Sequence, residues 1–153
     1  MRYALGFFAA VALLAGCGGS SRLSKQDYEQ QLKRDATLIA KAATNASTAD
    51  FNSPGQYARR VALAQKDMTR AAKDLDAIKP PADATEDTKK IVAGVRYLAK
   101  ALARLHHAAT TSSFAEAQQV SSDIAASPEV KGVSTAIKDL ERKGYDVGAF
   151  SGA

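Results

Sequence analysis

Two adjacent histidines, His106 and His107, are the residues whose type is best suited to metal chemistry in this chain of 153 residues. Neighbouring residues on a helix point about 100° apart, so both rings cannot easily bind one metal ion from the same helix. The positions three and four residues away hold no Asp, Glu, Cys or His that could complete a site. A transition-metal or pH-sensing site that also uses Asp50 from a facing loop is therefore an alternative. The simpler interpretation places one histidine at the edge of the core, near Tyr57, and the other in solvent.

Other patterns that carry catalysis or hold a cofactor are missing from the sequence. It has no Cys-x-x-Cys-His, no glycine-rich phosphate loop, no Gly-x-Ser-x-Gly and no His-Glu-x-x-His. Met68 and a histidine are the remaining axial pair for a haem. Helix geometry puts Met68 roughly 17 Å and His106 roughly 35 Å from the turn between their helices. We therefore expect a protein that is not an enzyme and that has no metal or haem.

Cys17 is the only cysteine of the chain, so it has no disulfide partner within it. It follows Arg2 and an apolar run of 11 residues, Ala4–Leu14. Such a run is too short for a membrane-spanning helix, which needs about 20 residues, but fits the hydrophobic region of a signal peptide. The stretch Gly18–Ser21 has the composition of a flexible tether. A cysteine between a signal and a tether has no folded pocket around it, which disfavours a catalytic role.

The sequence Leu14-Ala15-Gly16-Cys17 resembles the lipobox of bacterial lipoproteins at all four positions. The resemblance implies cleavage between Gly16 and Cys17, a diacylglycerol thioether on Cys17, and acylation of the new amino terminus with chains such as palmitate. One acyl chain binds a bilayer marginally, whereas two or three form a stable anchor. The resemblance thus implies a lipid-anchored protein on the extracytoplasmic face of a bacterial cell envelope, with the choice of membrane open.

Composition and charge narrow the function classes further. Hydrophobic residues make up 46% and charged residues 24% of the chain, which is typical of a globular protein. Aromatic residues are only 7% and Trp is absent, which favours helices over a β-sandwich. The net charge of +5 suits an anionic lipid, an anionic polymer or an acidic envelope protein, whereas nucleic acid is not an expected partner outside the cytoplasm. A docking stripe for such a partner is predicted at Lys89, Arg96, Lys100 and Arg104, with a plain solvated helix face as the alternative.

Four helical segments are predicted from apolar residues that recur three and four positions apart. They span approximately residues 24–47, 54–79, 85–110 and 113–143. Ser24, Ser53 and Ser113 are predicted N-caps, and Pro80-Pro81 ends the second segment. The fourth segment keeps its apolar phase across Ser127-Pro128, so we expect it to be kinked or broken near Pro128 without reversing direction.

These segments and their short connections predict an all-α fold, an antiparallel up-down-up-down four-helix bundle. The expected organisation is a signal peptide at residues 1–16, which is removed, and a lipidated cysteine with a tether at 17–23. The bundle follows at 24–144 and a C-terminal tail at 145–153. Whether the tail packs on the bundle is open.

The layout also resembles small secreted helical lipoproteins, because of Pro80-Pro81 between two long helices and the tail Gly144–Gly148. The roles of those proteins are mostly undefined, so the resemblance implies a fold and not an activity. The expected function is a non-catalytic binding or scaffolding module at the cell envelope, anchored by its acyl chains. The alternative is a helical bundle that binds a small ligand or a transition metal at the end that holds His106 and His107.

Overall fold

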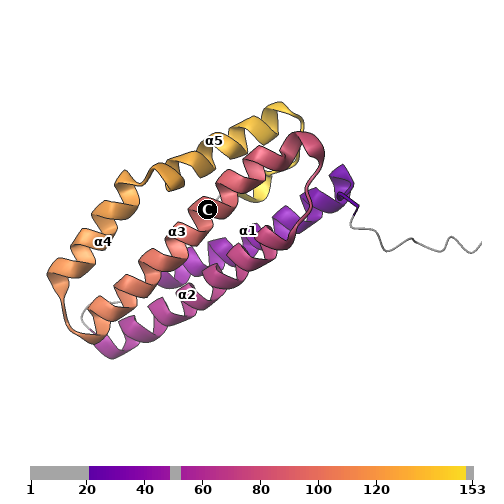
Figure 1. Ribbon diagram of the computed structural model, residues 1–153. Coiled ribbons are helices and arrows are strands. Elements are labelled where there is room, and N and C mark those ends of the chain that lie inside the picture. The colour runs from indigo at the N-terminus through magenta and orange to yellow at the C-terminus, as the bar shows by residue number, and fades with distance from the viewer. Residues whose placement is uncertain (1–20, 49–52, 151–153) are drawn as a thin grey trace, which may run out of the picture.

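The computed structural model describes residues 21–48 and 53–150. Within these two ranges all regular structure is helical, as the all-α prediction requires (Figure 1). The elements are α1 (Lys25–Ser47), α2 (Pro54–Ala77), η1 (Ala82–Ala84), α3 (Thr85–Thr110), α4 (Phe114–Ala126), α5 (Pro128–Arg142) and η2 (Gly148–Phe150).

Serine side chains cap three of the helices. Ser24 Oγ accepts a hydrogen bond from the Asp27 N–H at 3.1 Å at the start of α1. At the start of α4, Ser113 Oγ accepts one from the Glu116 N–H at 3.3 Å. Both caps were predicted. Ser53 makes no such side-chain bond, and α2 begins with Pro54, whose missing N–H needs no partner there.

The fourth predicted segment is broken in two at Ser127, which ends α4 and begins α5. The buried Ser127 side chain accepts a hydrogen bond from the Val130 N–H at 3.2 Å. The helix cannot continue through Pro128 because proline has no N–H and its ring clashes with the preceding turn. Figure 1 shows that α4 and α5 nevertheless follow one another along the same side of α3, so the predicted break near Pro128 is confirmed.

Helix α2 packs against α1 on one side and α3 on the other, and α3 also packs against α4 and α5. The interior of this stack is built from apolar residues three and four positions apart, as predicted. Its largest completely buried apolar side chains are Tyr28, Leu32, Val61, Leu75, Ile91, Val95, Val120, Leu140 and Val147.

The chain reverses after α5 through Gly144, whose φ of +79° suits glycine. The Tyr145 N–H donates to the Leu140 carbonyl at 3.0 Å and closes the end of the helix. The following Tyr145, Val147 and Phe150 are buried, and η2 contacts α1. Residues 145–150 of the tail therefore pack on the helices; residues 151–153 lie outside the described ranges.

Candidate functional site

A hollow lies between α1 on one side and α4 and α5 on the other, and we call it the apolar groove. It encloses about 360 Å³, within the range of small-molecule sites. Thirteen of its fourteen lining residues are apolar, and Ser134 is the one polar residue among them. The lining residues are Ile39, Ala42, Ala43, Ala46, Met68, Val95, Leu98, Leu102, Ile124, Val130, Val133, Ser134, Ile137 and Phe150.

The groove exists because no helix closes this side of the stack. Helix α1 packs on α2 and on η2, but it forms no comparable interface with α4 or with α5. Alanines line most of the α1 wall (Ala42, Ala43 and Ala46), and their short side chains do not reach across. As a result Val130, Val133 and Ile137, which the sequence pattern predicts in the core, are only half-buried.

A close contact at Gly94 holds α5 against α3. A Cβ atom at this position would collide with Val133 Cγ2 and lie 2.9 Å from the carbonyl oxygen of Glu129. Glycine therefore lets the two helix axes approach closely. The same contact fixes α5 at a distance from α1 and so helps to set the width of the apolar groove.

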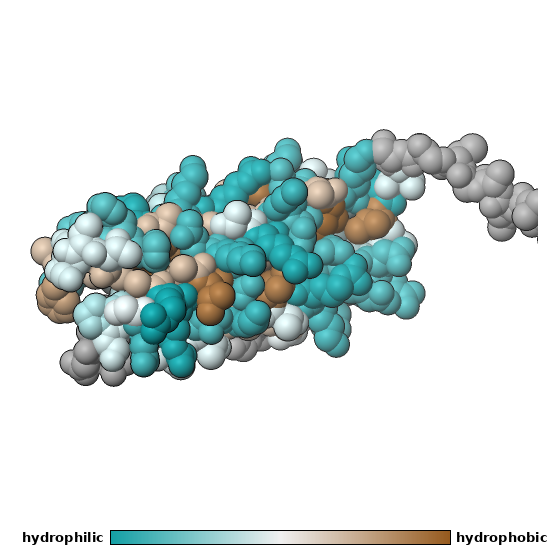
Figure 2. Space-filling view, turned by 90° about the horizontal axis from the view of Figure 1, so that it is seen from below, coloured by the Kyte–Doolittle hydropathy of each residue, from teal (hydrophilic) through white to brown (hydrophobic). Residues whose placement is uncertain are grey.

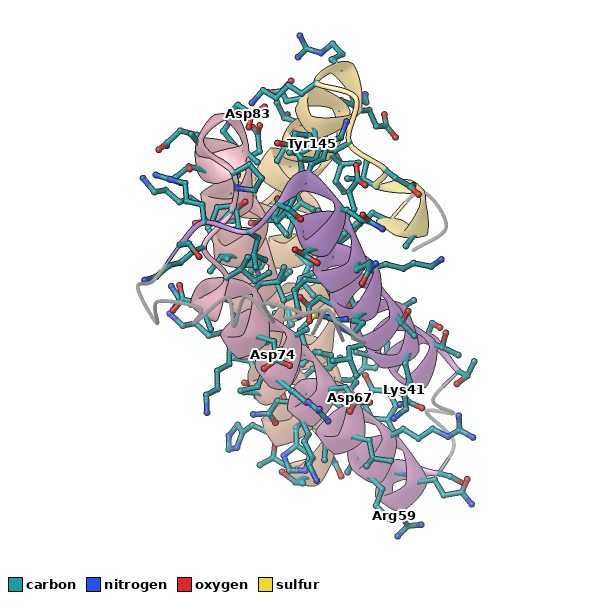
Figure 3. All side chains as sticks on the ribbon, turned by 90° about the vertical axis from the view of Figure 1, so that its right-hand side faces the viewer. Lys41, Arg59, Asp67, Asp74, Asp83 and Tyr145 are labelled. Carbon is teal, nitrogen blue, oxygen red and sulfur yellow. The ribbon has the colours of Figure 1, made fainter. Side chains whose placement is uncertain are left out.

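Phe150 of η2 lines the groove, and other residues of the tail make contacts that hold this segment in place. The Tyr145 hydroxyl donates to Asp83 Oδ1 at 2.7 Å, and its ring meets that of Tyr28 edge-on, with centroids 5.5 Å apart. Figure 3 shows Tyr145 and Asp83 together at one end of the molecule, with Arg59 at the other. The Asp146 N–H also donates to Glu29 Oε1 of α1 at 2.9 Å. The tail thus connects α1 to the rest of the chain beside the groove.

An ion pair between the exposed Lys143 and the buried Asp87 supports this end of the molecule. Lys143 Nζ lies 2.6 Å from Asp87 Oδ2 and donates to the Asp83 carbonyl oxygen at 2.6 Å. The hydrogen bond to Asp87 raises the pKa of Lys143. Burial raises the pKa of both Tyr28 and Tyr145 to about 12, so neither phenol ionises near neutral pH. These contacts hold the end of α5 and the tail against the start of α3.

Apolar surface elsewhere is sparse on the part of the chain that the structure describes. Leu63 and Phe114 are the large apolar side chains that are exposed there, at 54% and 65%. Figure 2 shows that the side of the molecule turned to the viewer is mostly hydrophilic, with apolar residues in small separate patches. A second hollow, of about 170 Å³ and lined in part by Tyr57 and Phe114, is about half as large as the apolar groove.

The two histidines differ in exposure: His106 is half-buried and His107 is exposed. Asp50, the third residue of the metal alternative, lies outside the described residues. No group of three or more His, Cys, Asp or Glu side chains in residues 21–48 and 53–150 could hold a metal ion. The metal site at His106 and His107 stays a prediction, and these residues do not line the apolar groove.

Three of the four cations in the predicted docking stripe already have carboxylate partners. Lys89 Nζ lies 2.7 Å from Glu86 Oε1, and Arg96 Nη2 lies 2.6 Å from Asp76 Oδ2 on α2. Arg104 Nη1 lies 2.7 Å from Asp123 Oδ2 on α4. Lys100 is exposed. Docking of an acidic partner on this stripe stays a prediction, and it would have to compete with these pairs.

The predicted cleavage and lipidation positions, Gly16 and Cys17, lie outside the described residues. Two residues assigned to the tether are bound to the connection between α2 and α3. The Leu23 N–H donates to the Lys79 carbonyl oxygen at 2.8 Å. Arg22 Nη1 donates to the Pro80 carbonyl oxygen at 2.9 Å. Arg22 and Leu23, which precede α1, thus contact the rest of the protein.

Sequence reasoning missed Asp35, a carboxylate on α1 that is only 1% exposed. Burial raises its pKa to about 6, against the lowering effect of a hydrogen bond from Gln31 Nε2 at 3.0 Å. A signal was present, because Asp35 lies three residues after Leu32 and four before Ile39, on the predicted apolar face. The apolar groove was also missed, because its walls come from helices far apart in the sequence.

No protein-family model, curated protein or solved structure matches the chain. Among the helices that the structure describes, none combines the length and the apolar character needed to cross a membrane.

Proposed function

We propose that this protein is a lipid-anchored, extracytoplasmic lipoprotein that binds an apolar ligand in the groove between α1 and α4–α5, without catalysis. The groove is the observation that carries the proposal. It is the hollow with the largest number of apolar lining residues, and it is open along a seam whose residues have the pattern of a core. Apolar surface left in water is unfavourable, so a ligand that covers this seam is stabilised by its burial.

The helical arrangement that goes with this proposal is an up-down-up-down bundle in which α4 and α5 together form the fourth member. Packing of α1 on α2, α2 on α3 and α3 on α4 and α5 supports it, as do the short connections. In such a bundle, ligands are bound between facing helices. The incompletely closed side between the first and fourth members is where a ligand would enter.

The free energy gained by burying a hydrocarbon chain indicates whether the groove is large enough to bind one. Each buried methylene contributes roughly 0.8 kcal/mol, so a chain with roughly eight buried methylenes would gain roughly 6 kcal/mol. Loss of translational and rotational freedom offsets part of this gain. Reversible binding is therefore expected, as suits a protein that carries or presents a ligand and does not transform it.

The test of the groove uses the mature chain from residue 17 with Cys17→Ser, which removes the acyl chains that would compete for an apolar probe. An uncharged dye such as Nile red should bind saturably. Ala43→Phe places a large ring in the groove from an exposed position on α1 and should weaken binding by at least about tenfold. Ala115→Phe, on an exposed position of α4 that does not line the groove, is the matched control. Absence of saturable binding, or equal loss in both variants, would contradict the proposal.

The anchor is supported by the lipobox resemblance at Leu14-Ala15-Gly16-Cys17. Its test is independent of the groove. In a bacterial host, the unmodified chain should incorporate a labelled palmitate analogue and fractionate with membranes. Cys17→Ser should abolish the label and release the protein from that fraction. A membrane-bound Cys17→Ser protein would argue against a lipid anchor as the means of attachment.

A further inference from the structure

Lysines lie along the edges of the apolar groove, and the carboxylates next to the α5 edge have other partners. Glu129 accepts a hydrogen bond from Ser127 Oγ at 2.7 Å, and Asp139 is paired with Lys90 and Arg142. The α1 wall falls within residues 36–47 and the α5 wall within residues 130–138, and neither segment contains Asp or Glu. These segments hold Lys41, Lys131 and Lys138. Lys41 is engaged with Asp67 of α2 at 3.1 Å, and both residues are labelled in Figure 3. At the α4 end, the carboxylate of Asp123 is paired with Arg104.

Lys131 and Lys138 are exposed, and each follows directly after a residue that lines the groove, Val130 and Ile137 respectively. In the part of the chain that the structure describes, neither lysine has a carboxylate partner. This contrasts with the α3 stripe, where three of the four cations are paired. Two unpaired cations beside an apolar hollow favour a ligand that is apolar at one end and anionic at the other.

Ser134 lies between the two lysines on the same helix. It comes three residues after Lys131 and four before Lys138, so all three side chains project from one side of α5. Ser134 is the one polar residue of the groove lining, and the residue is exposed. The two lysines are seven residues apart, a rise of about 10.5 Å along the helix. A small anionic group can therefore lie near Ser134 with a lysine on either side.

The volume limits the apolar part of the ligand. At about 360 Å³, the groove lies near the lower end of the roughly 300–1,000 Å³ that ligand pockets span. A single hydrocarbon chain suits a hollow of this size. Phe150 is among the residues that would contact this chain.

From these observations we infer that the groove takes a single-chain anionic amphiphile, with the acyl chain between α1 and α5 and its carboxylate at Lys131, Ser134 and Lys138. This inference rests on the proposed function, since it names the class of ligand for the same groove. It also makes a distinct claim, because the groove alone would accept neutral and charged chains of equal length alike. Charge selectivity is therefore the property to measure.

The test compares three probes with the same twelve-carbon chain, dodecanoate, dodecanol and dodecyltrimethylammonium, below their aggregation concentrations. Each is titrated against the dye-loaded mature chain carrying Cys17→Ser. Dodecanoate should displace the dye at a concentration at least about tenfold lower than dodecanol, because hydrogen bonds to charged groups are the stronger ones. The cationic probe should be the weakest, and added salt should reduce the preference for the anion. Acetate at the same concentrations should displace nothing.

The variant Lys131→Gln/Lys138→Gln should lose the preference for dodecanoate and keep the affinity for dodecanol. Its matched control is Lys66→Gln/Lys73→Gln, which removes two exposed lysines with the same spacing from α2. Equal affinities of the parent for dodecanoate and dodecanol would overturn the inference and leave the proposed function standing. Binding of none of the chains would overturn both. A concentration-dependent dimer that Ala43→Phe abolishes would also overturn the inference, since a second copy would then be the occupant of the groove.

Discussion

Asp35 is a buried carboxylate whose charge is unfavourable in the folded protein. It accepts a hydrogen bond from Gln31, and Arg34 of α1 and Arg70 of α2 favour its ionised form. Burial and the nearby Asp74 of α2 outweigh these effects and raise the pKa of Asp35 to about 6. An Asp in an unfolded chain has a pKa near 3.9. Between these two values, unfolding releases a proton from Asp35, so the contribution of Asp35 to the free energy of unfolding falls as the pH rises from about 4 to about 6.

Asp35→Asn is therefore predicted to stabilise the protein at pH 7, by on the order of 1–3 kcal/mol, because the amide removes the buried charge and can still accept from Gln31. Below about pH 4 the variant and the parent should have similar stability, since the parent carboxyl is then protonated in both states. Urea unfolding at pH values between 4 and 7 measures both effects. Parallel pH profiles for the two proteins would mean that Asp35 does not titrate in this range.

Ser112 adopts a left-handed backbone conformation, with φ of 54°, in the turn between α3 and α4. The turn is closed by the Ser113 N–H, which donates to the Ala108 carbonyl at 2.9 Å. A residue with a Cβ atom is strained there by roughly 1–2 kcal/mol, and glycine is not. Part of the gain is lost because glycine has more conformational entropy in the unfolded chain.

We predict that Ser112→Gly raises the free energy of unfolding by about 0.5–1 kcal/mol, measured by urea denaturation. Ser112→Val should lower it, because a β-branched side chain is the least compatible with this conformation. A glycine variant less stable than the parent would show that the serine side chain contributes more than its backbone strain costs.

At the scale of the helices, the contact between α3 and α5 depends on the absence of a side chain at Gly94. In a free helix Gly→Ala would stabilise by about 1 kcal/mol, through propensity. Here the new methyl group would meet Val133 and the backbone of Glu129, so one helix must shift. Overpacking of this kind costs typically 1–3 kcal/mol.

Gly94→Ala is predicted to lower the free energy of unfolding by about 1–3 kcal/mol, since the clash outweighs the gain in propensity. Gly132→Ala on α5 is the matched control, because nothing lies within 4 Å of the added Cβ atom. The control should instead be stabilised, by about 0.5–1 kcal/mol. Opposite signs in thermal or urea unfolding would verify the contact, and equal stabilisation of both variants would contradict it.

Helix positions were readable from the sequence because they depend on neighbours within one turn. The serine caps at Ser24 and Ser113, the turn at Gly144 and the break at Pro128 are local features of this kind, and the structure has all four. The seam of α2 was also predicted, and its residues from Tyr57 to Leu75 are buried. Alternating steps of three and four residues identify a buried face without reference to the rest of the fold.

The apolar groove could not be read in this way. A pattern on α5 shows that Val133 and Ile137 face other residues, but not whether a helix covers them completely. That depends on the separation of α1 from α5, which is set by non-local contacts at Gly94 and at Phe150. The burial of Asp35 was missed for a related reason. Its place on the apolar face was visible in the sequence. A charged residue on such a face is expected at the solvent-exposed edge, and only the position of the neighbouring helix shows that it is buried.

At the scale of the whole molecule, Phe150 joins the C-terminal part of the chain to its first helix. Phe150 is 8% exposed, and it lines the apolar groove. Phe150→Ala should lower the free energy of unfolding by about 2–4 kcal/mol and enlarge the groove. Urea unfolding and dye affinity measure the two effects. Phe114→Ala makes the same replacement at a side chain that is 65% exposed and should change stability by less than about 0.5 kcal/mol. Similar losses in both variants would show that packing of Phe150 does not stabilise the fold.

The contacts of Arg22 and Leu23 with Lys79 and Pro80 decide how the molecule would respond to tension on its N-terminus. A pull from the membrane would first load these hydrogen bonds, and through them the connection between α2 and α3 in the middle of the chain. The first turn of α1 would be spared until they break, so α1 would not peel away one turn at a time. With the proposed anchor on Cys17, these hydrogen bonds would reinforce the point of attachment, and the groove beside α1 would keep its shape under load.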